Sequence, residues 1–120
     1  MYQLKNVRHN FDVNVGDVGV TVRKGVKWSK TKHGDKLELW VCNQSHYGMC
    51  NESLGCHKVG EGMVLGYWVG PYGKLPPALL SIEHNITLRD KQQLTAILKK
   101  VYGSIKNDDI VTALIYLRTK

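Results

Sequence analysis

Alternation of apolar and polar residues predicts β-strands in four parts of this chain. Period-two alternation, or a run of β-branched residues between turn-forming residues, is typical of strands. Such segments are found at residues 19–24, 36–42, 62–69 and 109–118. The second alternates most regularly, and one of its faces is made by Leu37, Leu39 and Val41. The last, DIVTALIYLR, is apolar enough to be buried on both faces of a sheet.

A helical repeat lies between the third and last predicted strands. Apolar residues follow the i, i+3, i+4, i+7, i+8 spacing of an amphipathic helix at Leu94, Ile97, Leu98, Val101 and Tyr102. We assign this stripe to the core. Thr87 or Asp90 is suited to cap the start of the helix, and Gly103 its end. A shorter helix is predicted within 75–82, since proline is tolerated in a first turn.

The order of elements, β-β-β-α-α-β, favours an α+β fold in which short strands form a small, partly open β-barrel with one or two helices. With 120 residues, a single domain over 1–120 is expected. The hydrophobic content of 42% excludes a disordered chain. No apolar run is long enough for a membrane span, and residues 1–10 lack the apolar core of a signal peptide. We therefore expect a soluble cytoplasmic protein.

Charge adds a candidate binding surface. The net charge is +7, which favours polyanionic partners. Part of it is concentrated in the predicted hairpin between the first two strands, whose candidate nucleic-acid-binding residues are Arg23, Lys24, Lys27, Trp28, Lys30 and Lys32. An arginine offers a planar fork to phosphate, and a tryptophan can stack a base. The alternative is a solvated hairpin with Trp28 packed on the barrel.

Cysteine and histidine are clustered after the second predicted strand. The stretch CNQSHYGMCNESLGCH holds Cys42, His46, Cys50 and Cys56, a ligand set that zinc accepts, although its spacing is not that of a standard zinc knuckle. The alternatives are a loop with free thiols or a reactive cysteine. Three cysteines without a secretory signal favour reduced thiols over a disulfide framework. Apart from zinc, no cofactor is expected.

Several of these segments together resemble the ASCH domains, members of the PUA-like fold. The resemblance rests on GDVGVTVRKG, with its Thr-x-Arg strand, on HGDKLELWVC, with its Gly-Asp turn, and on GEGMVLGYWVG. It is strongest in LTAILKKVYGSIKNDDIVTALIYLR, which resembles the ASCH helix, turn and closing strand. It covers roughly residues 16–118 and implies a barrel with a cleft beside the Thr-x-Arg strand.

ASCH domains are generally thought to bind RNA or modified nucleosides, and some members hydrolyse an acetylated cytidine or cleave RNA. By this resemblance, Thr21 and Arg23 match the family's strand residues, and Glu83 falls near the glutamate that precedes the main helix. The amidohydrolase branch also has a lysine, at the position that Val18 occupies here.

The expected function is therefore binding of RNA or a modified nucleotide through a basic cleft. A nucleoside or RNA hydrolase with catalytic Thr21 and Glu83 is the first alternative, in which the glutamate is the general base. A plain polar loop around Glu83 and His84 is the structural alternative to that site. A small protein that modulates a larger complex through a protein partner is the remaining hypothesis.

Overall fold

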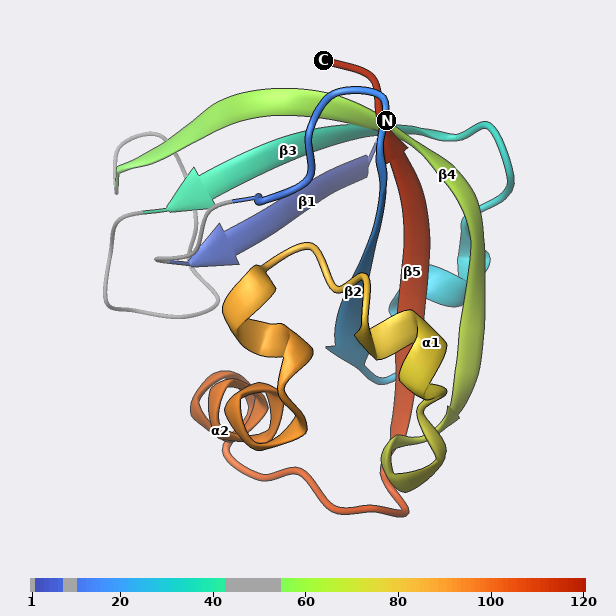
Figure 1. The fold of residues 1–120 in the computed structure, drawn as a ribbon, viewed down its shortest axis with the longest axis vertical. Coiled ribbons are helices and arrows are strands. Elements are labelled where there is room, and N and C mark those ends of the chain that lie inside the picture. The colour runs from blue at the N-terminus through green and yellow to red at the C-terminus, as the bar shows by residue number, and fades with distance from the viewer. Residues whose placement is uncertain (1, 8–10, 43–54) are drawn as a thin grey trace.

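The computed structural model describes residues 2–7, 11–42 and 55–120, which form a strongly curved sheet flanked by helices (Figure 1). The strands are β1 (Tyr2–Val7), β2 (Val18–Lys24), β3 (Lys36–Cys42), β4 (Cys56–Pro71) and β5 (Ile110–Arg118). They are arranged in the order β1-β3-β4-β5-β2. The β1–β3 pair is parallel and the other three pairs are antiparallel.

In the described part of the chain, the helical elements lie between β4 and β5, apart from one turn after β2. They are η1 (Lys27–Lys30), η3 (Tyr72–Lys74), α1 (Pro77–Leu80), η4 (Ile86–Arg89) and α2 (Lys91–Tyr102). The predicted amphipathic helix is confirmed as α2. The Asp90 side chain caps it by accepting from the Gln92 backbone N–H, and Gly103 ends it with a φ of +83°. Neither α-helix of the described ranges is long and apolar enough to cross a bilayer.

The four predicted strands are confirmed as β2 to β5, whereas β1 was not predicted. Polar residues interrupt its short alternation, so the sequence YQLKNV lacks a strand signal. The segment forms a strand because it pairs with β3, where Leu4 lies opposite Leu39 and both side chains are fully buried. Burial of a leucine side chain contributes about 2 kcal/mol. Tertiary pairing with β3 therefore makes a strand of a segment that is locally ambiguous.

The α+β class is confirmed, but the sheet is not closed, so the expected barrel is not confirmed. The ends of the sheet are β1 and β2. The segment before η4 extends the free edge of β2: the Val20 N–H donates to the Ile82 carbonyl at 3.0 Å, and the His84 N–H donates to the Val20 carbonyl at 2.7 Å. This segment, rather than another strand, occupies the edge of β2 and brings Glu83 into the fold.

Among the described residues, two core clusters share the strand β5. One cluster packs β2 and β5 against the helices and includes Val20, Val22, Leu94, Leu98 and Val111. The other joins β1, β3, β4 and β5 with Trp28 and includes Leu4, Leu39, Leu114 and Tyr116. Because side chains alternate along β2, Val20 and Val22 point towards the helices, whereas Thr21 and Arg23 point to the opposite face of the strand. The predicted core stripe of α2 is confirmed at Leu94 and Leu98, and it is wrong for Val101 and Tyr102, which are exposed at the last turn of the helix.

Candidate functional site

Thr21 and Arg23 lie on one face of β2, as strand alternation predicts. The Arg23 Nε donates to the Thr21 Oγ1 at 3.0 Å, and Thr21 is almost completely buried. Lys24 points away from them. Its Nζ donates to the Ser104 carbonyl at 3.1 Å and lies 3.6 Å from the Asp109 carboxylate. Two neighbouring cations of the predicted basic hairpin therefore serve different parts of the molecule.

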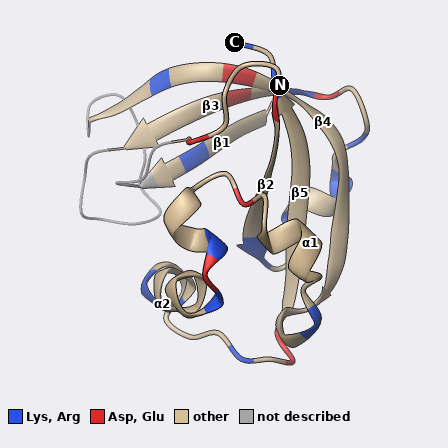
Figure 2. Cartoon of the chain, viewed as in Figure 1, with Lys and Arg blue, Asp and Glu red and all other residues tan. Residues whose placement is uncertain are grey.

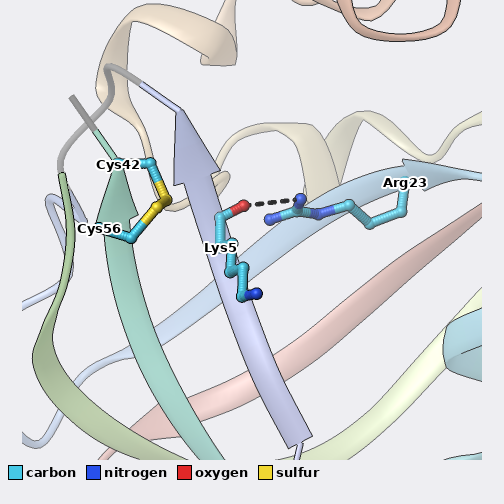
Figure 3. Close-up of a disulfide and its surroundings, with 4 residues drawn as sticks. All are labelled: Lys5, Arg23, Cys42 and Cys56. Atoms are coloured by element: carbon cyan, nitrogen blue, oxygen red, sulfur yellow. Dashed lines mark hydrogen bonds between the residues drawn. A yellow bond between two sulfur atoms is a disulfide. The ribbon is translucent and has the colours of Figure 1, made fainter. Parts of the chain in front are cut away.

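The Arg23 guanidinium bridges the two ends of the open sheet. Its Nη1 donates to the Lys5 carbonyl at 3.0 Å, and its Nη2 donates to the Asn6 Oδ1 at 3.1 Å. Figure 3 shows the side chain reaching from β2 to the backbone of β1. Three of its donors are thus used within the protein. Arg23 therefore fixes the position of β1 as well as supplying positive charge at this place.

Glu83 is the most buried acid of this region, with 1% of its surface exposed. Its Oε2 accepts the Asn85 backbone N–H at 2.7 Å, and its Oε1 lies 3.3 Å from the His84 Nε2. Burial raises the pKa of Glu83 to about 8, against the smaller lowering effects of the Asn85 N–H, Arg23 and Arg89. Burial therefore favours the neutral form of this carboxyl group.

His84 is held on both sides of its ring. Its Nδ1 lies 2.9 Å from the Tyr116 hydroxyl, and its Nε2 lies 3.3 Å from the Asn6 Nδ2. Phe11 packs edge-on against the imidazole, with ring centroids 4.8 Å apart. Burial also raises the pKa of Tyr116, so its hydroxyl keeps its proton. These contacts join β1, β5 and the segment before η4 into one polar network.

A cavity of about 80 Å³ opens beside this network. Its polar wall comes from β1, β2 and the segment before η4, and consists of Lys5, Asn6, Thr21, Arg23, Glu83 and His84. Its apolar wall comes from η4 and α2 and includes Leu88, Leu94, Ile97, Leu98 and Val101. A cavity lined by apolar residues together with a few polar groups is a candidate site for a small molecule.

The predicted site residues Thr21, Arg23 and Glu83 are therefore brought together in one cavity. Sequence reasoning missed Lys5 and Asn6, because both lie on β1, the strand that was not predicted. It also missed that the α2 stripe, besides forming core, supplies the cavity's apolar wall. The one local signal for the missed polar residues is the interruption of apolar alternation in YQLKNV by lysine and asparagine.

The rest of the basic hairpin lies apart from the cavity residues. Trp28 is 8% exposed and packs in the core with its ring centroid 5.8 Å from that of Tyr2, so the packing alternative holds for this residue. The Nζ atoms of Lys27 and Lys30 lie 5.9 Å from the Trp28 and Tyr2 ring centroids, respectively. Lys27, Lys30 and Lys32 are exposed. Figure 2 shows that lysine and arginine are spread over several elements.

The zinc hypothesis is not supported. Cys42 and Cys56 form a disulfide (Figure 3), which contradicts the expectation of reduced thiols. The β3–β4 register sets Cys42 opposite Cys56, a pairing that the sequence spacing does not show. Within the ranges 2–7, 11–42 and 55–120, no three His, Cys, Asp or Glu residues are grouped to hold a metal. The other suggested ligands, His46 and Cys50, lie outside the described residues.

Comparison with known protein families, with curated proteins and with solved structures finds no match for this chain.

Proposed function

We propose that this protein binds RNA or a modified nucleotide, and that the cavity between β1, β2 and α2 receives one base or nucleoside. The observation that carries this proposal is the gathering of Thr21, Arg23 and Glu83 in one cavity with an apolar opposite wall. A base matches the chemistry of the two walls because it has two flat apolar faces and a polar edge, and the cavity of about 80 Å³ has to widen to take the whole ring. The apolar residues of α2 would cover a face, and the strand residues would bind the edge.

Charge outside the cavity supports a polyanionic ligand. The chain has a net charge of +7, Lys27, Lys30 and Lys32 are exposed, and Lys30 lies over Tyr2 at the start of β1. Lys5, which lines the cavity, follows Tyr2 by three residues, or about 10 Å along a strand. Strand side chains alternate, so Tyr2 and Lys5 point to opposite faces of β1, and a ligand that reaches both the cavity and the η1 lysines has to pass around the edge of β1.

The resemblance to ASCH domains supports the same proposal. It indicates Thr21, Arg23 and Glu83 from their places in the sequence alone, and the residues that line the cavity include all three. Within this proposal, the chain is an ASCH-like domain of the PUA-like fold. A ligand of this kind also fits a cytoplasmic protein, since RNA and free nucleotides are abundant there.

Titration of a fluorescent single-stranded RNA at about 50 mM and about 200 mM salt tests the proposal. Released counterions should make the affinity fall roughly tenfold or more over that range. Arg23→Ala should weaken binding at both salt concentrations. Lys24→Ala is the matched control, because it removes the same charge from the next residue of β2 but leaves the cavity unchanged.

A thermal melt of each variant separates binding from stability, since Arg23 also holds β1. Equal losses for Arg23→Ala and Lys24→Ala would contradict a role for the cavity and leave only diffuse charge. No binding of RNA at low salt would contradict the proposed function itself.

One observation favours hydrolysis as a second candidate function. Glu83 lies buried in the same cavity as the Thr21 hydroxyl and Lys5, and its raised pKa suits it to act as a general acid rather than as the expected general base. Incubation with an acetylated cytidine and with RNA, followed by chromatography of the products, tests it. A hydrolase should lose turnover in Glu83→Gln while retaining substrate affinity; absence of product from the wild type would exclude these two substrates.

A further inference from the structure

We propose that the site binds two successive nucleotides of a single strand, with the second base stacked on the ring of Tyr102 at the mouth of the cavity. This inference rests on the proposed function and extends it, because it makes a dinucleotide segment, rather than one nucleoside, the smallest complete ligand. It is carried by the order in which buried polar residues, half-buried cations and exposed apolar residues line the cavity.

The residues that line the cavity range from buried to exposed. Thr21, Glu83 and Leu94 are 2%, 1% and 1% exposed, so they form the floor of the cavity. Val101 and Tyr102 line the same cavity but are 37% and 38% exposed, so they form its mouth. A ligand that reaches the floor therefore enters beside these two residues.

The two mouth residues are the end of the apolar stripe of α2. The stripe begins in the core with Leu94 and Leu98, and it reaches solvent at the last turn of the helix. Among the described residues, the Tyr102 ring packs on no other aromatic ring. Covering it with the flat face of a base is favourable, because apolar surface of both rings is then removed from water.

The backbone that carries Tyr102 is anchored on its C-terminal side. The Gly103 N–H donates to the Lys99 carbonyl at 2.8 Å and closes the last turn of α2 with a φ of +83°. Ile105, which follows shortly after, is 7% exposed and belongs to the core cluster that packs β2 and β5 against the helices. Tyr102 is thus an exposed aromatic ring on a fixed backbone, and it loses little conformational freedom when a base stacks on it.

Two cations provide a place for the phosphate that links the two nucleotides. Lys5 from β1 and Arg23 from β2 line the cavity and are half-buried, which places them between its floor and its mouth. Three of the five N–H groups of the Arg23 guanidinium bond to described residues, so two remain for a ligand. Glu83 is the one acid among the described lining residues, so this wall is net positive in either form of that carboxyl group. A phosphodiester is an anion that such a wall binds.

The size of the cavity keeps the second base outside. A volume of about 80 Å³ has to widen for one ring, so it has no room for another. The neighbouring base of the strand consequently lies at the mouth, where Tyr102 offers its ring. Stacking on an aromatic side chain accepts any base, because every base has a flat π face. The mouth therefore adds affinity without base specificity, whereas the polar floor contacts the edge of one base.

Calorimetric titration with the dinucleotides ApA and CpC, and with the 5′- and 3′-methylphosphates of adenosine and cytidine, tests the proposal. All these ligands carry one phosphodiester charge, so they differ in the number of bases and not in charge. The wild type should bind each dinucleotide more tightly than the matching methylphosphates. Tyr102→Ala should lower the dinucleotide affinity by roughly 5- to 150-fold, the range for loss of one stacked base, and change the methylphosphate affinity by less than about twofold.

Two further variants control this measurement. Tyr102→Phe keeps the aromatic ring and should bind both kinds of ligand like the wild type. Tyr67→Ala removes a tyrosine of β4 that is 44% exposed and does not line the cavity, so it should leave both affinities unchanged. The ring-proton NMR signals of Tyr102 should move upfield on addition of ApA but not of the methylphosphates, because a ring current acts on them only when a base stacks there.

Two results would overturn the inference while the proposed function stands. Equal losses for dinucleotides and methylphosphates in Tyr102→Ala would show that Tyr102 contacts the same nucleotide as the cavity. An unchanged dinucleotide affinity in that variant would show that no base stacks on Tyr102. In both cases, RNA binding that Arg23→Ala weakens would still support the cavity as a binding site. If the wild type binds neither RNA nor any of these ligands, the proposed function and this inference fail together.

Discussion

At the scale of single residues, the burial of Glu83 should make the stability of the protein depend on pH. Burial raises its pKa from 4.5 to about 8, so the folded chain keeps a proton that the unfolded chain releases. This contribution to stability is complete below about pH 4.5 and declines as the pH rises towards 8. The free energy of unfolding should therefore fall by up to about 1.4 kcal/mol per pH unit in this window.

Urea unfolding at several pH values between about 5 and 8 measures the effect for the wild type and Glu83→Gln. The glutamine reproduces the neutral acid, since its oxygen can accept the Asn85 N–H and its amide can donate to His84. It should flatten the pH dependence and stabilise the protein near pH 8. Parallel curves for the two proteins would show that Glu83 does not carry the proton.

A second residue-scale prediction concerns the glycine behind His84. A Cβ at Gly19 would lie 2.5 Å from the Val13 Cγ2 and 3.3 Å from the His84 Cβ. Gly19→Ala should therefore displace the segment before β2 and destabilise the protein by about 1–3 kcal/mol. Gly66→Ala is the control, because a Cβ there meets no atom within 4 Å, and its effect should stay within about 0.5 kcal/mol. Chemical unfolding of both variants measures the difference; equal losses would argue against close packing at Gly19.

At the scale of elements, the sequence predicts those strands and helices whose own pattern determines them. The regular alternation of β3 and the helical spacing of α2 are local signals, and both elements are confirmed. The strand β1 depends on its parallel partner, so its residues Lys5 and Asn6 stayed outside the predicted site. Thr21, Arg23 and Glu83 were found through a resemblance, since nothing local shows that Glu83 pairs with the edge of β2.

The disulfide gives an element-scale prediction. Cys42 ends β3 and Cys56 begins β4, so the bond closes a loop with a sequence separation of 14 residues. Loop closure of this size stabilises a fold by about 3 kcal/mol. Replacing both cysteines with alanine should therefore lower the free energy of unfolding by about 2–4 kcal/mol, as measured in urea.

Wild-type protein treated with a reductant should approach the stability of the double alanine variant, which itself should not respond to the reductant. Mass spectrometry after alkylation gives an independent check on the bond. The peptides that contain Cys42 and Cys56 should remain unmodified until the protein is reduced. Their modification without reduction would support free thiols, the state more usual in a reducing cytoplasm.

At the scale of the whole molecule, the proposed ligand has to contact two separate regions, the cavity and the lysines beside η1. Lys30 lies over Tyr2 at the start of β1, and Lys5 lines the cavity three residues further along the strand. An RNA that occupies both regions releases counterions at the η1 lysines and uses the cavity for one base. Salt dependence and cavity specificity should consequently be separable by mutation.

Changing Lys27 and Lys30 to glutamine should lower the slope of log affinity against log salt by about 1.4, the value for two lost phosphate contacts with a single strand. A second pair, Lys74→Gln with Lys106→Gln, removes the same charge from η3 and the segment before β5, where no cavity residue lies. That pair should leave the slope unchanged. RNA titration over a salt series measures both. If the two pairs of substitutions reduce the slope equally, net charge alone attracts the RNA. The proposal that one RNA contacts both the cavity and the η1 lysines would then be wrong.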